Sequence, residues 1–229
     1  MNNSAQNLKA LVVGSTGAIG QELVKELVIS QNWSEVHVIA RKEHESWNQF
    51  SQEQRQKLKI VKVENFDTLQ DASQFNNFQN INSVFCCLGA VQKNGKENFI
   101  KVDQFYPQYV ADIALKNKIP QYHIVTSQKA DKNSMFFYFR IKGEVEYLLQ
   151  QKKLNYLGIY RPGLLLNRTG ERFVEKVCSY IPFIKKIDVR DVATAMRIQA
   201  EKNYNLQLNT DKTEIFENND IINISAIKK

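Results

Sequence analysis

Cysteine, histidine and long apolar runs are all scarce in this chain of 229 residues. Of its three cysteines, Cys86 and Cys87 are adjacent within an apolar run, a spacing that fits neither a disulfide framework nor a metal-binding Cys-x-x-Cys motif. We expect this adjacent pair to serve as small buried hydrophobic residues. Such cysteine usage is typical of proteins from a reducing compartment.

The three histidines do not indicate a metal site. His37, His44 and His123 lack the spacing of metal ligands, and no cluster of acidic residues or cysteines accompanies them. We therefore predict no bound metal. His123 falls within an apolar run typical of a strand, where a histidine with satisfied hydrogen bonds in the core or at a sheet edge is expected.

No apolar run approaches the length of a membrane span, and the polar first residues lack the features of a signal or transit peptide. These absences predict a soluble protein of a reducing intracellular compartment. The cytoplasm is the first expectation and the nucleus the second, and import into an organelle through an internal signal stays open.

The formal net charge of +7 and a pI near 9.2 favour anionic partners such as nucleotides, acidic lipid surfaces or nucleic acid. However, the basic residues are scattered in pairs such as Lys152-Lys153 and Lys185-Lys186, and no run of five occurs. A solvated surface is the simpler interpretation. We predict no nucleic-acid binding, because the charge is dispersed and no recognition motif is present.

Short apolar runs alternate with segments of helical periodicity along most of the chain. The predicted strands are Leu8–Val13, Val36–Ala40, Lys59–Val63, Ser83–Leu88, Tyr122–Thr126, Leu157–Tyr160 and a late strand around Ile215–Glu217. The predicted helices are Ala18–Ile29, Phe99–Asn117 with a possible break or kink at Pro107, Tyr138–Gln151 and a helix that starts near Val189–Met196.

This alternation predicts an α/β protein of the Rossmann type, with a doubly wound parallel sheet and helices on both faces. The near-continuous apolar strands agree with burial on both sides. We expect one NAD(P)-binding domain over residues 1–229. Within it, residues 164–188 and 205–229 are expected to form a small C-terminal substrate or lid region.

The first strand runs into a glycine-rich turn that opens a helix. Gly14 permits the tight turn, Gly17 lets the backbone approach a pyrophosphate, and Gly20 allows close packing of the helix on the strand. The helix N-terminus supplies unpaired N–H groups and a positive dipole end for phosphates. This context predicts a dinucleotide site.

The residues after the second strand indicate which dinucleotide binds. A site specific for NAD usually carries a carboxylate here for the adenosine ribose, whereas this chain has Arg41 and Lys42. Two cations suit the 2′-phosphate of NADP. The alternative is that both are ordinary solvated cations.

Tyr138 and Lys142 are four residues apart on a predicted helix and hence lie on one face of it. An ammonium beside a phenol stabilises the phenolate, which suits Tyr138 to general acid/base chemistry. Ser127, just after the fifth strand, is placed to orient a substrate carbonyl. The aromatic run Phe136–Phe139 fits either the lining of a hydrophobic substrate pocket or packing of a helix on the sheet or against a partner.

Four further stretches give the sequence a family resemblance: Phe85–Gly89, Lys129–Lys132, Lys142–Glu146 and Tyr160–Gly163. With the glycine turn, they resemble the atypical branch of the short-chain dehydrogenase/reductase superfamily, in particular the Tat-interacting oxidoreductase (metastasis suppressor) family. The resemblance runs from about Leu8 into the last thirty residues.

The resemblance implies roles for specific residues. Ser127, Tyr138 and Lys142 match the catalytic triad, with Lys142 also holding the nicotinamide ribose. The residues implied in cofactor binding are Gly14, Ser15, Gly17, Ala18, Ile19, Arg41, Lys42, Leu88, Gly89, Tyr138, Lys142, Arg161, Pro162, Gly163 and Leu164.

The sequence departs from the family pattern at one residue and in two segments. Asn65 stands where relatives usually carry Asp near the adenine. The segments around Arg168–Arg172 and Ser179–Asp188, where the family forms its substrate lid, are short.

Two functions follow from these features. The first is an NADP(H)-dependent oxidoreductase that acts on a carbonyl/alcohol pair, in which the cofactor carries the chemistry and the protein supplies orientation. The second is an NADPH-binding regulatory protein, or an accessory subunit of a larger assembly, with little or no turnover. The sequence does not indicate the substrate, the oligomeric state or the protein partners.

Overall fold

The computed structural model describes residues 6–90, 95–167, 185–204 and 211–227. Seven strands form one sheet in the order β3-β2-β1-β4-β5-β6-β9, and every neighbouring pair is parallel. In chain order these strands are β1 (Leu8–Val13), β2 (Trp33–Ala40), β3 (Leu58–Lys62), β4 (Ser83–Cys86), β5 (Gln121–Val125), β6 (Tyr156–Arg161) and β9 (Lys212–Glu217). The predicted Rossmann fold is confirmed.

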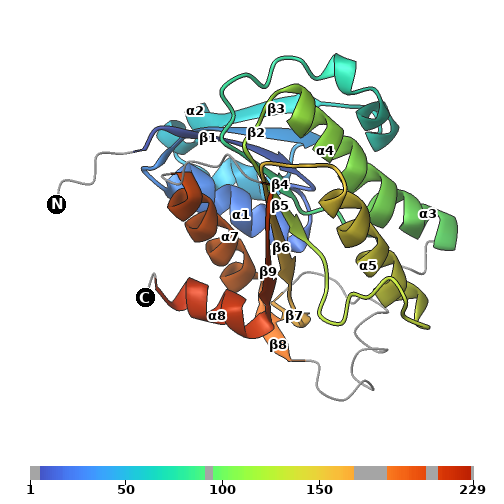
Figure 1. Cartoon of the computed structure of the whole chain (residues 1–229). Coiled ribbons are helices and arrows are strands. Elements are labelled where there is room, and N and C mark those ends of the chain that lie inside the picture. Colours follow the sequence, from blue (N-terminus) through green and yellow to red (C-terminus); the bar gives the residue numbers. More distant parts are fainter. Residues whose placement is uncertain (1–5, 91–94, 168–184, 205–210, 228–229) are drawn as a thin grey trace.

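Helices cover both faces of this sheet (Figure 1). One face carries α1 (Ala18–Ile29) and α7 (Val189–Tyr204), and α8 (Asn218–Ala226) packs against α7. The opposite face carries α4 (Tyr106–Lys116) and α5 (Phe137–Gln150). The shorter helical segments are α2 (Gln52–Lys57), α3 (Lys96–Ile100), η1 (Glu45–Gln49), η2 (Phe66–Gln70) and η3 (Ala72–Gln74).

The strand β1 shows why the sheet needs both helical layers. Its side chains alternate between the two faces. Ala10 and Val12 belong to the apolar cluster that includes α1 and α7, whereas Leu11 and Val13 belong to the cluster that includes α4. All four are fully buried. A strand buried on both faces carries a continuous apolar run, which is the pattern that the sequence shows.

The order in which strands are added to the sheet changes side between β1 and β4. From β1 the chain proceeds to β2 and β3 on one side, and it then returns to place β4 on the other side of β1. In open α/β sheets such a switch point leaves a crevice at the carboxyl ends of the strands. The turn after β1 and the segment after β4 meet at this crevice.

The single long helix predicted over Phe99–Asn117 is three consecutive segments. The helix α3 leads into a π-helical turn, η5 (Lys101–Phe105), and α4 follows. Pro107 lies in the first turn of α4, where its missing N–H interrupts no hydrogen bond of that helix. The backbone stays helical through η5, so the chain is not broken at the proline, and Asp103 in the π-helical turn before it is buried.

Several short elements were not predicted. The helix α2 is polar and starts at a capping box formed by Ser51 and Gln54. Two three-residue strands, β7 (Leu164–Leu166) and β8 (Lys186–Asp188), pair in a small separate sheet. The expected lid falls largely on residues 168–184, which lie outside the described residues. In the described part of the chain, no helix is long and apolar enough to cross a membrane.

His123 is a core histidine, as one of the two sequence alternatives predicted. It lies within β5 and is fully buried, with one ring nitrogen 3.1 Å from the Tyr160 hydroxyl and the other 3.1 Å from Gln121 Oε1. Burial lowers the pKa of His123 to about 3. The imidazole is therefore neutral at physiological pH.

Candidate functional site

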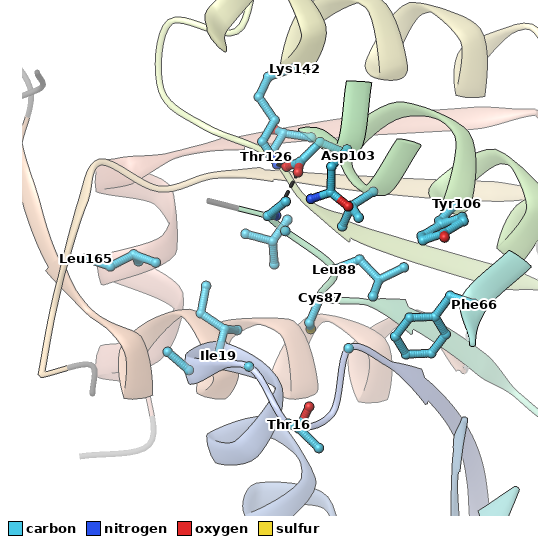
Figure 2. A pocket seen from close by; sticks show the side chains of 18 of the residues that line it. Thr16, Ile19, Phe66, Cys87, Leu88, Asp103, Tyr106, Thr126, Lys142 and Leu165 are labelled. Carbon is cyan, nitrogen blue, oxygen red and sulfur yellow. Dashed lines mark hydrogen bonds and ion pairs between the residues drawn. The ribbon is translucent and has the colours of Figure 1, made fainter. Parts of the chain in front are cut away.

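A cavity of about 480 Å³ lies at the switch point, at the carboxyl ends of β1, β2, β4 and β5 (Figure 2). Its volume falls in the range typical of small-molecule sites. The predicted site residues that line it are Gly14, Gly17, Ala18, Ile19, Arg41, Leu88, Gly89, Tyr138 and Lys142. The lining residues that the sequence did not predict are Thr16, Phe66, Cys87, Ala90, Asn98, Val102, Asp103, Tyr106, Val125, Thr126 and Leu165.

The three glycines of the turn are required for different reasons. Gly14 has a φ of +87°, and a Cβ there would lie 2.5 Å from the carbonyl carbon of Cys87. A Cβ on Gly20 would lie 2.1 Å from the Gly14 carbonyl oxygen. Gly17 has an ordinary backbone conformation, and a Cβ there would meet no atom closer than 3.4 Å. Packing within the protein therefore explains Gly14 and Gly20, but it does not explain Gly17.

The N-terminus of α1 opens onto this space. Gly17 is the N-cap residue and makes no side-chain capping bond, and the first turn of α1 contains no acidic residue. Its unpaired N–H groups and the helix dipole favour an anion. Ser15 is buried beside the turn, and its hydroxyl has no hydrogen-bond partner among the described residues. A backbone cradle that lacks a Cβ at Gly17 fits the pyrophosphate of a dinucleotide.

The end of the cavity next to β2 carries a cation. The Arg41 guanidinium lies 5.6 Å from the ring centre of Phe66, and Phe66 in turn meets Tyr106 edge-to-face. Among the described residues, no carboxylate lies within 4.0 Å of Arg41. Asn65 also lines this end, and its side-chain oxygen accepts a hydrogen bond from the Asp67 N–H. Lys42 is exposed and does not line the cavity.

The opposite end holds Tyr138 and Lys142, which both project from α5. The Lys142 ammonium is almost fully buried and lies 2.7 Å from a carboxylate oxygen of Asp103. Burial lowers the pKa of Lys142, but the charge and hydrogen bond of Asp103 outweigh it, so the net pKa is raised above its usual value. Lys142 is therefore an ammonium throughout the physiological range.

Two hydroxyl residues follow β5, and only one of them lines the cavity. Ser127, the predicted residue, donates a hydrogen bond to the Gln128 carbonyl and is not part of the lining. Thr126 lines the cavity, and its hydroxyl donates to Glu146 at 2.6 Å. The strand ends at Val125, one residue before the predicted end. Because successive side chains alternate in direction, a shift of one residue changes which hydroxyl faces the cavity.

The predicted segment Arg161–Leu164 does not line the cavity; Leu165 does. Arg161 forms an ion pair with the buried Glu146 and a second one, at 3.0 Å, with Glu217. Backbone groups of the segment are bonded to other parts of the chain: the Gly163 N–H donates to Asn218 and the Leu164 N–H to the Lys185 carbonyl, each at 2.7 Å. This segment therefore ties β6 to the C-terminal elements.

The aromatic run at the start of α5 serves more than one purpose. Phe139 is buried and Phe136 is exposed. Tyr138 lines the cavity, and its ring packs 5.6 Å from that of Phe99 on α3. Both sequence alternatives, pocket lining and helix packing, hold for different residues of the run.

Comparison with known proteins agrees with this geometry. Residues 14–201 match the model of a family described as NAD(P)H-binding. Protein HTATIP2 from Rattus norvegicus is 32% identical over 187 residues, which span 77% of this chain and 73% of the relative. Protein FMP52, mitochondrial, from Debaryomyces hansenii is 27% identical over 164 residues, which span 70% of this chain and 68% of that protein.

Solved structures share the fold at low sequence identity. MoeE5 in complex with UDP-glucose and NAD superposes with a TM-score of 0.68 at 14% identity, covering 96% of this chain and 82% of that one. A variant of ElxO with NADPH bound superposes with a TM-score of 0.65 at 14% identity, covering 94% of this chain and 99% of that one.

The family match spans most of the chain, including the glycine turn and the helix that carries Tyr138 and Lys142. The chain is therefore a nicotinamide dinucleotide-binding, oxidoreductase-like protein of the atypical short-chain dehydrogenase/reductases, and it belongs to the HTATIP2 (Tat-interacting protein) family.

Proposed function

We propose that this protein is an NADP(H)-dependent oxidoreductase that acts on a carbonyl/alcohol pair. The observation that carries the proposal is the shared cavity: the glycine turn before α1, Tyr138 and Lys142 all line it. A phosphate cradle at one place and a phenol with an ammonium at another are what such a reaction needs from the protein.

Different residues along the cavity would contact different parts of the dinucleotide and the substrate. The turn Gly14–Gly17 and the first N–H groups of α1 would hold the pyrophosphate, and Lys142 would donate hydrogen bonds to the ribose next to the nicotinamide. The bound dinucleotide supplies the hydride. Tyr138 would give a proton to the substrate oxygen during reduction and take it back during oxidation.

The third group of the triad is a hydroxyl after β5. The sequence favours Ser127, whereas the cavity wall favours Thr126. We propose that Thr126 contacts the substrate oxygen, because a group must lie within hydrogen-bond reach of the atom it orients. In this structure the hydroxyl proton of Thr126 is donated to Glu146, so the hydroxyl would rotate away from Glu146 to donate to a substrate carbonyl.

The preference for NADP over NAD rests on Arg41. Its guanidinium lines the cavity without a carboxylate partner among the described residues, so its charge is available to a 2′-phosphate. The cavity offers no acidic side chain next to Arg41 for the ribose hydroxyls of NAD among the residues that the structure describes. Lys42 is exposed and would contribute only long-range attraction.

A screen of aldehydes and ketones, followed by the loss of NADPH absorbance, tests the activity. Wild type should consume NADPH with at least one substrate, and Tyr138→Phe should bind NADPH equally well but lose most of the turnover, by about 10²-fold or more. If both proteins bind NADPH and neither shows turnover above background, the enzymatic proposal is wrong.

One observation favours the alternative, an NADPH-binding regulatory or accessory protein with little turnover. Both hydroxyls after β5 already donate their protons within the protein, Ser127 to Gln128 and Thr126 to Glu146. A substrate carbonyl would need one of them to rotate. Under this alternative, NADPH would change the binding of a protein partner, and Tyr138→Phe would leave that effect unchanged.

The cysteine usage supports a proposal for the compartment. We propose a reducing intracellular compartment, with the cytoplasm first, because the described cysteines are unpaired, Cys86 being buried. The relative from Debaryomyces hansenii is named mitochondrial, which makes import into that organelle the main competing location. Fractionation of cells that express a tagged chain distinguishes the two.

A further inference from the structure

The ion pair between Asp103 and Lys142 is buried on both sides. Asp103 is 2% and Lys142 6% exposed, whereas most other ion pairs between described residues include at least one side chain that is partly solvated. Desolvating two charges costs several kcal/mol per ion unless geometry and further hydrogen bonds offset it. A cost of this size beside a ligand cavity needs a reason.

Asp103 satisfies both of its oxygens at the cavity wall. One oxygen lies 2.7 Å from the Lys142 ammonium, and the other accepts a hydrogen bond of 2.7 Å from the Ala90 N–H. Ala90 lies in the segment after β4 and lines the cavity together with Leu88 and Gly89. Figure 2 shows the Asp103 and Lys142 side chains directed toward one another above that segment.

The backbone around Asp103 is built to place it there. It lies in the π-helical turn η5. Such turns are rare in proteins overall, but those that occur are often found at functional sites. Val102 of this turn also lines the cavity, whereas the polar residues Lys101 and Gln104 make outer contacts, Lys101 with Asp67 and Gln104 with Glu144. Of the polar residues of the turn, Asp103 alone lines the cavity.

We propose that Asp103 is a positioning residue of this site. Its carboxylate orients the Lys142 ammonium toward the dinucleotide and compensates the charge of that ammonium. Its second oxygen holds the carboxylate in place through the hydrogen bond from the Ala90 N–H. The inference rests on the proposed function only in that Lys142 holds the dinucleotide. Asp103 acts through Lys142, and it is neither the acid nor the base of the reaction.

The proposal makes a pH-dependent prediction. The groups that face Lys142 are Asp103 from η5, Tyr138 from its own helix and the Cys86 thiol from β4. Of these, only Asp103 is a carboxylate, and it forms the ion pair with Lys142. Without it, the main charge that opposes the effect of burial is lost, so the pKa of Lys142 falls. Asp103→Asn should therefore lose the ammonium, and with it dinucleotide affinity, as the pH rises.

The inference is tested by measuring the dissociation constant of NADPH by calorimetry at about pH 7 and about pH 9. This binding measurement does not depend on enzymatic turnover. Affinity of Asp103→Asn should fall about tenfold over this range, while wild type should change less than about twofold. Asp112→Asn is the matched control, because Asp112 also pairs with a lysine, Lys152, but lies in α4 away from the cavity. It should behave as wild type.

A double-mutant cycle separates positioning from a purely structural role. In a Lys142→Met background, where Asp103 has lost its partner charge, adding Asp103→Asn should lower NADPH affinity no further and should produce no pH effect, because Asp103 acts through the lysine. If Asp103→Asn alone does not fold, the double variant should, since it leaves no buried charge unpaired.

Three results overturn the inference: an Asp103→Asn variant whose NADPH affinity is as independent of pH as that of wild type, an equal loss in the Lys142→Met background, or a double variant that does not fold. Failure of wild type itself to bind NADPH would instead refute the proposed function, so the two failures are distinguishable.

Discussion

Gly17 is the N-cap of α1 and Gly20 lies in the first turn of that helix, and the structure predicts opposite consequences for replacing each with alanine. A Cβ on Gly17 would meet its nearest neighbour, the Gly14 oxygen, at 3.4 Å, which is ordinary van der Waals contact. Its φ of −78° and ψ of 167° suit any residue. A Cβ on Gly20 would lie 2.1 Å from the same oxygen. Only the second substitution conflicts with the protein itself.

The magnitudes follow from these contacts. Gly17→Ala replaces one N-cap residue with a poorer one, which should lower the free energy of unfolding by about 0.5–1 kcal/mol. Gly20→Ala forces two backbone segments apart and should cost about 3 kcal/mol or more. For NADPH affinity we expect the opposite ranking among variants that fold: Gly17→Ala should lose more affinity than Gly20→Ala, because the added methyl group at position 17 would occupy the phosphate cradle. We expect at least about a tenfold loss of NADPH affinity, which corresponds to about 1.4 kcal/mol.

Urea denaturation and calorimetric titration with NADPH measure the two effects separately. Gly17→Ala should unfold with a midpoint close to that of wild type and bind NADPH weakly. The reasoning is refuted if Gly17→Ala binds NADPH as tightly as wild type, or if it is destabilised as much as Gly20→Ala.

Three further predictions concern single side chains. Arg41→Ala should weaken NADPH binding by about tenfold or more and NADH binding less than about twofold, as measured by calorimetry, and equal losses would contradict the NADP assignment. Thr126→Val should reduce turnover by about tenfold or more while Ser127→Ala changes it little, and the reverse order in steady-state kinetics would restore Ser127. His123 resists protonation in the folded state down to about pH 3 but gains a proton near pH 6.5 when unfolded, so stability should fall as the pH drops through this window, by at most about 1.4 kcal/mol per unit. His123→Gln should flatten that dependence in urea denaturation at a series of pH values, and an unchanged slope would assign it to other groups.

Local patterns were sufficient to predict the first half of the nucleotide site. The strand Leu8–Val13 and the helix Ala18–Ile29 were predicted with the boundaries that the structure shows. The reason is physical: a strand buried on both faces, a glycine turn and an amphipathic helix each leave a signal within a few neighbouring residues. The position of Arg41 at the end of β2 follows in the same way.

The features that the sequence could not supply depend on contacts between distant segments or on the exact end of an element. Asp103 pairs with Lys142, which is far from it in the chain, and nothing near Asp103 in the sequence marks it as buried. The π-helical turn that places Asp103 cannot be predicted from the spacing of apolar residues, which indicates a helix but not its type. The choice between Thr126 and Ser127 depends on one residue at the end of β5, which is finer than patterns of hydrophobicity can determine.

Calorimetric titration of the purified protein with NADPH and with NADH tests the central claim most directly. The account predicts saturable binding of one dinucleotide per chain, with NADPH bound at least about tenfold more tightly than NADH because of the Arg41 guanidinium. Absence of saturable binding by either dinucleotide would contradict the assignment of the cavity between β1 and β4 as a nicotinamide dinucleotide site.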